Sequence, residues 1–283
     1  MLMCETIEKT RAQAQAWRRE GLSVGLVPTM GYLHAGHKSL IERAARENDR
    51  VVVSDFVNPI QFGPQEDLQR YPRDLPRDRA LCEQAGAALL FHPSVQEMYA
   101  PGCATAVAVR GITEGLCGKT RPAHFGGVCT VVAKLFNIVR PDRAYFGQKD
   151  AQQLLVIRRM ARDLDFGVQV VGCPIIREAD GLAMSSRNTY LSPAGRKAAP
   201  VLHRALEAGR ALAESGEKDA RRICAAVRAV LAGEPLAQPE YVEVVDAQTA
   251  APAPTLDRPV LCAIAVRIEK TRLIDNFFYP PEV

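Results

Sequence analysis

The chain has 283 residues, of which 47% are hydrophobic and 24% are charged, and its formal net charge is +4. This length is long for a single hydrophobic core and suits a larger domain joined to a smaller one. The composition is that of an ordinary globular protein, and so mild a positive charge gives no reason to expect a nucleic-acid partner. No run approaches 18 consecutive apolar residues, so we predict no membrane-spanning helix.

Short apolar strands alternate with helices through the first 175 residues. The predicted helices are 5–19, 35–47, 74–86, 125–139 and 150–163, and the predicted strands are 22–27, 51–57, 88–91, 143–146 and 167–171. Strands that are apolar throughout and separated by helices are typical of a parallel sheet covered on both faces. We therefore predict a Rossmann-like, doubly wound α/β domain over residues 1–175.

The pattern changes after residue 175. Residues 198–232 are rich in alanine and arginine and read as helical, and two alternating apolar runs follow at 241–245 and 260–267. The Pro/Ala-rich stretch 247–258 separates these two runs. We expect residues 176–283 to form a smaller α+β domain with an antiparallel sheet, which would act as a lid over the first domain.

Two histidines follow the first predicted strand of the larger domain. His34 and His37 lie behind the glycine turn at Gly31, on the expected first turn of helix 35–47. A helix N-terminus offers unpaired backbone N–H groups and a positive dipole end, which favour phosphate. The alternative is a helix cap with a packed ring, which needs no ligand. A second, distant signal is needed to decide between them.

Two later segments supply such a signal. Met184-Ser-Ser-Arg187 places hydroxyls and a guanidinium in a loop after Gly181, and Lys149 and Asp150 follow the predicted strand 143–146. Hydroxyl, guanidinium and ammonium groups all bind phosphate oxygens, although an ordinary loop and a solvated lysine are the alternatives. Asp150 is also a plausible N-cap of helix 150–163.

Six segments, in this order and at these spacings, resemble the pantoate–β-alanine ligase family. That family belongs to the nucleotidyltransferase superfamily with the His-x-Gly-His motif, which is related to class I aminoacyl-tRNA synthetases. The resemblance rests on segments that cover nearly the whole chain: Pro28–His37, Phe56–Phe62, Arg121–Phe125, Gly147–Gln153, Asp180–Asn188 and Thr271–Asn276. Each piece is weak alone, and the set is specific.

The resemblance implies an enzyme that joins pantoate to β-alanine through a pantoyl adenylate, giving pantothenate, AMP and pyrophosphate. It assigns ATP to Met30, Gly31, His34, His37, Gly147, Gln148, Lys149, Asp150, Ile176, Met184, Ser185, Ser186 and Arg187. It assigns pantoate and β-alanine to Gln61 and Gln153, with Asn58 steadying the acyl phosphate region. A homodimer is expected on the same basis.

The catalytic roles implied by the resemblance fall to four residues. His34 and His37 would hold the phosphates, and His37 would be the proton donor to the departing pyrophosphate. Lys149 and Arg187 would neutralise charge that grows on the α-phosphate in the transition state. Mg²⁺ is expected, held mainly by ATP and water, with Asp150 a lesser candidate ligand.

The remaining motif residues are ambiguous. Arg121 and His124 could neighbour the site or belong to a structural loop. Gln148 stands where glutamate is common in the family, and Asp55 places a carboxylate within an apolar strand. If Asp55 is buried, we expect it to have a partner or a raised pKa.

The position of these residues supports a single site. His34, Asn58 with Gln61, and Lys149 each come just after a different predicted strand, and ligands of parallel sheets bind beyond the carboxyl ends of the strands. No Gly-x-Ser-x-Gly elbow and no Gly-x-x-x-x-Gly-Lys-Ser/Thr loop is present. The alternatives are another nucleotidyltransferase, or a class I-like synthetase, and a non-catalytic nucleotide sensor or nucleic-acid-binding module.

The start of the chain and its cysteines bear on location. Residues 1–8 carry charge where a signal peptide needs an apolar segment, so we expect a cytoplasmic protein. The eight cysteines are scattered, without a Cys-x-x-Cys pair or the spacing of a zinc site. Reduced, packed thiols are expected in that compartment.

Overall fold

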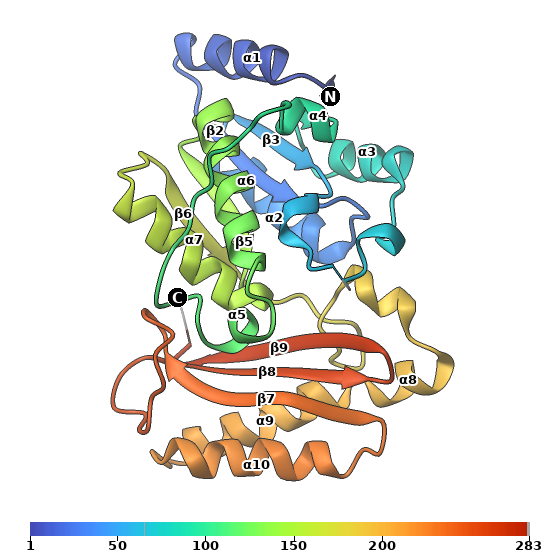
Figure 1. Ribbon diagram of the computed structural model, residues 1–283, viewed down its shortest axis with the longest axis vertical. Coiled ribbons are helices and arrows are strands. Elements are labelled where there is room, and N and C mark those ends of the chain that lie inside the picture. The colour runs from blue at the N-terminus through green and yellow to red at the C-terminus, as the bar shows by residue number, and fades with distance from the viewer. Residues whose placement is uncertain (65, 282–283) are drawn as a thin grey trace. The chain divides into compact units, whose positions relative to one another are not determined.

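A computed structural model describes residues 1–64 and 66–281 and contains two sheets (Figure 1). The larger sheet has six parallel strands in the order β1-β4-β3-β2-β5-β6. Its strands are β1 (Leu2–Cys4), β2 (Val24–Thr29), β3 (Arg50–Asp55), β4 (Leu89–Phe91), β5 (Arg143–Gly147) and β6 (Gln169–Cys173). The predicted doubly wound parallel sheet is confirmed.

Helices follow the strands as the alternating pattern predicts. The longer ones are α1 (Ile7–Arg19), α2 (Ala35–Glu47), α3 (Leu75–Gln84), α6 (His124–Val139) and α7 (Ala151–Asp163). Short helices, which the sequence did not predict, are α4 (Val95–Met98), α5 (Leu116–Thr120) and the 3-10 turns η1 (Pro59–Gln61), η2 (Leu68–Arg70) and η3 (Gln148–Asp150). Among the described residues, no helix is long and apolar enough to cross a membrane.

The central strands of the larger sheet carry apolar side chains on both faces, and both faces are buried. Val27, Val53 and Tyr145 belong to a core cluster with Leu40 and Ile41 of α2. Side chains alternate between the two faces of a strand, so Leu26 and Val52, which are fully buried, lie on the opposite face. There α1 and α6 pack against each other and against β2.

The order of the strands identifies where a ligand should bind. The chain runs outward from β2 through β3 to β4, and then crosses back to place β5 on the other side of β2. Such a reversal of strand order is a topological switch point. In open parallel sheets, ligands bind at this point, beyond the carboxyl ends of the strands. The adjacent strands β3, β2 and β5 precede Asn58, His34 and Lys149 in the chain.

The smaller sheet is antiparallel, with the order β7-β8-β9. It is formed by β7 (Ala237–Asp246), β8 (Val260–Ile268) and β9 (Thr271–Tyr279). Helices α9 (Val201–Glu214) and α10 (Ala220–Ala232) run along one of its faces (Figure 1), and α8 (Pro193–Ala198) and the 3-10 turn η4 (Ser186–Tyr190) precede them. The expected α+β character is present, with a third strand, β9, that the sequence did not predict.

By contacts, the chain divides into two compact units. The first comprises 1–109, 121–148 and 156–174, and the second comprises 110–120, 149–155 and 175–283. Residues 110–120 and 149–155 therefore group with the C-terminal part, although the sequence places them inside the N-terminal one.

Asp55 lies elsewhere in its strand than the sequence indicated. It is the last residue of β3 and pairs with Thr29, the last residue of β2, so Phe56 and Val57 lie beyond the strand. The expectation of a strand over 51–57 with Asp55 in its middle was wrong. Residues 56 and 57 are apolar and so continued the apolar run in the sequence, although pairing with the neighbouring strand β2 ends at Asp55.

Candidate active site

The turn after β2 is built around a glycine. Gly31 has φ +77°, a conformation that side chains other than glycine adopt at a cost, and its N–H donates to Thr29 Oγ1 at 3.2 Å. Thr29 Oγ1 donates in turn to the carbonyl of Ser54, at 2.7 Å. A Cβ at position 31 would lie 2.3 Å from Asp55 Oδ1, so only glycine fits here without movement of that carboxylate.

The two histidines begin helix α2 and cap it. His34 is the N-cap, directly before the helix that was predicted to begin at residue 35, and its Nδ1 accepts the N–H of Gly36 at 3.1 Å. His37 is the third helical residue, and its Nδ1 accepts the N–H of His34 at 3.2 Å. The pair therefore forms a capping box of the kind usually made by serine and glutamate.

The capping box determines the chemistry that the rings can offer. Because each Nδ1 accepts a hydrogen bond, the neutral form of each ring carries its proton on Nε2. The ring centroids of His34 and His37 are 4.0 Å apart, so the two rings lie together at the helix N-terminus. Two N–H donors at the positive end of a helix dipole suit a phosphate, so the capping role and the phosphate role are compatible.

Two buried carboxylates, those of Asp78 and Asp55, lie beside this turn. Asp78 of α3 accepts the N–H groups of Tyr32 and Leu33, each at 2.6 Å. Asp55 is 4% exposed, and burial raises its pKa to about 6, with the charge of Asp78 adding to the increase and His92 opposing it. His92 Nδ1 lies 3.8 Å from Asp55 Oδ2. Asp55 is buried, and its raised pKa agrees with the expectation of a partner or a raised pKa. No pattern in the sequence pointed to Asp78.

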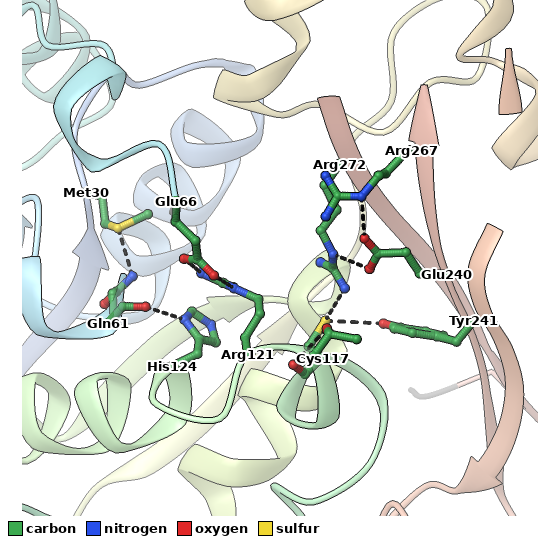
Figure 2. Close-up of polar contacts among 11 residues, drawn as sticks. Met30, Gln61, Glu66, Cys117, Arg121, His124, Glu240, Tyr241, Arg267 and Arg272 are labelled. Atoms are coloured by element: carbon green, nitrogen blue, oxygen red, sulfur yellow. Dashed lines mark hydrogen bonds and ion pairs between the residues drawn. The ribbon is translucent and has the colours of Figure 1, made fainter. Parts of the chain in front are cut away.

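Asn58 and Gln61 form a buried amide pair in the first unit. Asn58 donates to Gln61 Oε1 at 3.0 Å and to the carbonyl of Gly127 at 3.1 Å, and it accepts from Tyr99 Oη at 2.8 Å. Gln61 Nε2 donates to the sulfur of Met30 at 2.9 Å (Figure 2). Asn58 is 1% exposed, so its contacts make it a support for Gln61.

Arg121 and His124 hold the segments around Gln61. Arg121 forms a two-pronged ion pair with Glu66, with both N···O distances 2.6 Å, and this pair lowers the pKa of Glu66 although burial opposes it (Figure 2). His124 Nδ1 lies 3.0 Å from the carbonyl of Gln61. These contacts favour the structural reading of the Arg-Pro-x-His loop.

The residues after β5 lie in 3-10 turn η3 and the start of α7. Lys149 Nζ is 3.7 Å from Asp150 Oδ2, which is within ion-pair distance. Gln152 is buried and donates to the carbonyls of Ile112 and Gly115, at 3.0 and 2.9 Å, and it accepts the N–H of Cys117 at 2.9 Å. Gln153, the predicted substrate residue, is its partly exposed neighbour.

The Met-Ser-Ser-Arg loop is preceded by a small hairpin. Arg177 forms an antiparallel bridge with Ala183, and the N–H of Met184 donates to the carbonyl of Ile176 at 3.0 Å. The hairpin therefore brings together Ile176 and Met184, two predicted ATP residues eight positions apart. Ser185 then caps η4 by accepting the N–H of Arg187, at 3.3 Å.

The predicted site residues divide between the two units. The first unit holds Met30, Gly31, His34, His37, Asn58, Gln61, Gly147 and Gln148. The second unit holds Lys149, Asp150, Gln153, Ile176, Met184, Ser185, Ser186 and Arg187. Within the part of the chain that the structure describes, no three histidine, cysteine or acidic side chains are grouped to hold a metal ion.

Comparison with known proteins identifies relatives along the entire chain. Residues 2–278 match the family model described as pantoate–β-alanine ligase. A protein named pantothenate synthetase from Clostridium acetobutylicum is 56% identical over 98% of this chain and 99% of its own length. One of the same name from Heliobacterium modesticaldum is 58% identical over 98% of each chain.

Solved structures agree with the sequence relatives. The crystal structure of pantothenate synthetase from Thermus thermophilus has a TM-score of 0.93 and 53% identity, covering 98% of this chain and 99% of that one. The pantoate–β-alanine ligase of Francisella tularensis, solved with beta-gamma ATP and β-alanine, has a TM-score of 0.81 and 31% identity, covering 100% of this chain and 99% of that one.

Proposed function

Because the chain belongs to the pantoate–β-alanine ligase family, we propose that it makes pantothenate from pantoate and β-alanine with consumption of ATP. The enzyme is an ATP-dependent ligase that proceeds through a pantoyl adenylate and releases AMP and pyrophosphate. The observation that carries this conclusion is the match over residues 2–278, together with the paired histidines that cap α2.

The reaction has two steps, formation of the pantoyl adenylate and its reaction with β-alanine. A carboxylate oxygen of pantoate attacks the α-phosphorus of ATP, and the bond to pyrophosphate breaks. The amine of β-alanine then attacks the acyl carbon, and AMP leaves. Neither step needs a covalent protein nucleophile, so the protein contributes orientation and stabilisation of negative charge.

We assign the phosphates to His34, His37, Lys149 and Arg187. His34 and His37 donate from Nε2, because their Nδ1 atoms are used by the cap of α2. His37 is the donor toward the departing pyrophosphate. A neutral His37 ring donates a hydrogen bond to the pyrophosphate but does not transfer its proton. Proton transfer would require the imidazolium form, in which Nδ1 also carries a proton and can no longer accept the N–H of His34. Lys149 and Arg187 supply positive charge to the α-phosphate in the transition state.

The other assignments follow the same proposal. Gln61 and Gln153 bind pantoate through amide groups, which can both donate and accept, and Asn58 holds Gln61 in place. The remaining ATP contacts come from Met30, Gly31, Gly147, Gln148, Asp150, Ile176, Met184, Ser185 and Ser186. The hairpin contact between Ile176 and Met184 supports placing both beside the same ligand group.

Mg²⁺ is part of the proposal as a partner of ATP. Its preferred ligands are oxygens, and it usually keeps several waters and binds substrate phosphates. The described residues lack a group of three or more metal-binding side chains, which fits an ion carried by the triphosphate. Asp150, 3.7 Å from Lys149 Nζ, is the carboxylate that we propose as a lesser candidate ligand.

We also propose a cytoplasmic homodimer whose C-terminal unit serves as a lid. The eight cysteines are free thiols and six of them are buried, which fits a reducing compartment. Sedimentation of the purified protein tests the dimer directly.

The decisive experiment supplies ATP and pantoate but omits β-alanine. The expected result is pyrophosphate release that depends on pantoate, and subsequent addition of β-alanine yields pantothenate and AMP. Omission of pantoate is the control. Release of pyrophosphate that is indifferent to pantoate would reject the adenylate step, and so would the absence of any release.

A further inference from the structure

Strand β9 carries two consecutive buried polar residues that the proposed function does not use. Asp275 and Asn276 are 2% and 3% exposed, in a strand that also buries Leu273 and Phe277. Burying a carboxylate and an amide is costly unless both are hydrogen-bonded. The hydrogen-bond partners of Asp275 and Asn276 therefore show how these two polar side chains can be buried in the strand.

Asp275 holds the hairpin that precedes the Met184–Arg187 loop. Its two oxygens accept from Arg177 Nη1 and Nη2, at 2.6 and 3.0 Å, and Oδ1 also accepts the N–H of Asn276 at 2.8 Å. Arg177 Nη1 further donates to the carbonyl of Gly181 at 3.1 Å. One carboxylate thus fixes both arms of the hairpin through a planar, two-pronged contact.

Asn276 holds the other phosphate-binding segment of the same unit. Its Nδ2 donates to the carbonyl of Lys149 at 2.9 Å. Consecutive residues of a strand point to opposite faces, so Asp275 shares its face with Leu273 and Phe277 whereas Asn276 shares the other with Arg272. Arg272 contacts Cys117, at 3.5 Å between Nη2 and Sγ, in segment 110–120 (Figure 2).

We propose that Asp275 and Asn276 are positioning residues that fix Lys149 and the Ser185–Arg187 loop on one strand. Their place in β9 gives the lysine and the arginine–serine loop a common rigid support within the second unit. This inference rests on the proposed function, because it takes Lys149 and Arg187 as the groups that neutralise charge on the α-phosphate.

The test pairs two variants with a core control on the same strand. Asn276→Ala should lower kcat for pantoate-dependent pyrophosphate release by about tenfold to a hundredfold, with a smaller change in KM for pantoate, since a shift of roughly 1 Å has that effect on a reacting group. Asp275→Asn keeps the shape but weakens the contact with Arg177, and a loss of similar size is expected. Leu273→Ala should lower the melting temperature and leave kcat nearly unchanged at temperatures where the protein is folded.

Hydrogen exchange separates positioning from general loosening. Asn276→Ala should speed exchange in peptides covering 148–153 and leave 177–187 unaffected, and Asp275→Asn should give the reverse pattern. Equal acceleration in both segments, or unchanged kcat in both variants of a folded protein, would overturn the proposal. A wild-type protein without pantoate-dependent release would instead overturn the proposed function, and the exchange pattern would still report on the contacts.

Discussion

Variants of His34 can separate its observed capping contact from its proposed contact with phosphate. Its Nδ1 caps α2 through the N–H of Gly36, and its Nε2 is the proposed phosphate donor. Asparagine is among the best N-cap residues, whereas alanine in that position costs about 1 kcal/mol. His34→Asn should therefore keep the melting temperature and reduce pyrophosphate release by about a hundredfold, whereas His34→Ala should lose both.

The comparison of the two variants is itself the control. If His34→Asn retained full activity in a pantoate-dependent assay, the ring would serve only as a cap. If it lost stability as much as His34→Ala, the capping contact would have no energetic role.

Asp55 makes the stability of the protein depend on pH. Its pKa in the folded state is about 6 because of burial, above the value of 3.8 for an unperturbed aspartate. The folded state therefore binds more protons than the unfolded state between about pH 4 and 6, so stability falls as the pH rises through that range. Above it the carboxylate opposes folding by an amount on the order of 3 kcal/mol.

Asp55→Asn should remove this loss. The difference in unfolding free energy between the variant and the wild type should grow from about pH 4.5 to about pH 7.5, in the variant's favour, as measured by urea denaturation. Asp49→Asn is the control, because hydrogen bonds from Ser23 lower the pKa of Asp49 and its contribution has the opposite sign. A pH-independent difference for Asp55→Asn would show that the carboxylate keeps an ordinary pKa.

At the scale of elements, α3 determines the shape of the turn between β2 and α2. Asp78 accepts two backbone N–H groups of that turn, from Tyr32 and Leu33. Asp78→Ala removes the acceptor of one buried and one part-buried donor, at about 1–3 kcal/mol each. We expect a loss of roughly 2–5 kcal/mol in urea denaturation and a fall in pyrophosphate release, because His34 follows the turn directly.

Asp74 provides a matched control on the same helix. Its side chain caps α3 by accepting the N–H of Arg77, at 3.2 Å, whereas the hydrogen bonds from the N–H groups of Tyr32 and Leu33 go to Asp78. Asp74→Ala should cost about 1 kcal/mol and leave activity near wild type. Equal effects of the two substitutions on activity would show that α3 acts only through overall stability.

The elements that the sequence predicts well are those with a strong local pattern. Helix α2 has the expected bounds, 35–47, and the buried β-branched run of β3 was located within a few residues. Strand β9 was not predicted, because two consecutive polar residues, Asp275 and Asn276, interrupt its alternation. Their partners lie 98 and 127 residues earlier in the chain. Strand β1 has three residues, too few for any period to be visible.

The residues proposed for the candidate site could be chosen from the chemistry of their side chains, but the residues that hold them in place could not. His34, Lys149 and Arg187 stand out because their side chains suit phosphate and follow glycine turns or strand ends. Asp78 lies among many charged residues of α3 and has no distinguishing spacing. Its role depends on a contact with residues 46 and 45 positions earlier, which a local pattern cannot reveal.

At the scale of the whole molecule, the chain passes repeatedly between its two units. The sequence suggested a single boundary near residue 175, whereas 110–120 and 149–155 group by contact with 175–283. Gln152 joins these two short segments through Ile112, Gly115 and Cys117. The C-terminal residues alone therefore lack part of their own unit.

A fragment of residues 176–283 should accordingly fold poorly. It would lose Cys117, which lies 3.2 Å from Tyr241 Oη, and the carbonyl of Lys149 that pairs with Asn276. Tyr241 and Asn276 are buried in the intact unit, so their polar groups would be left without these partners. We expect the fragment to show a broad, weakly cooperative urea transition by circular dichroism, where the intact chain shows a sharp one.

Cys117→Ala in the intact chain is the control. Its urea transition should remain cooperative, since segment 110–120 and Gln152 stay in place. A fragment that unfolds as sharply as the intact chain, at the same midpoint, would show that segments 110–120 and 149–155 contribute nothing to the stability of the second unit.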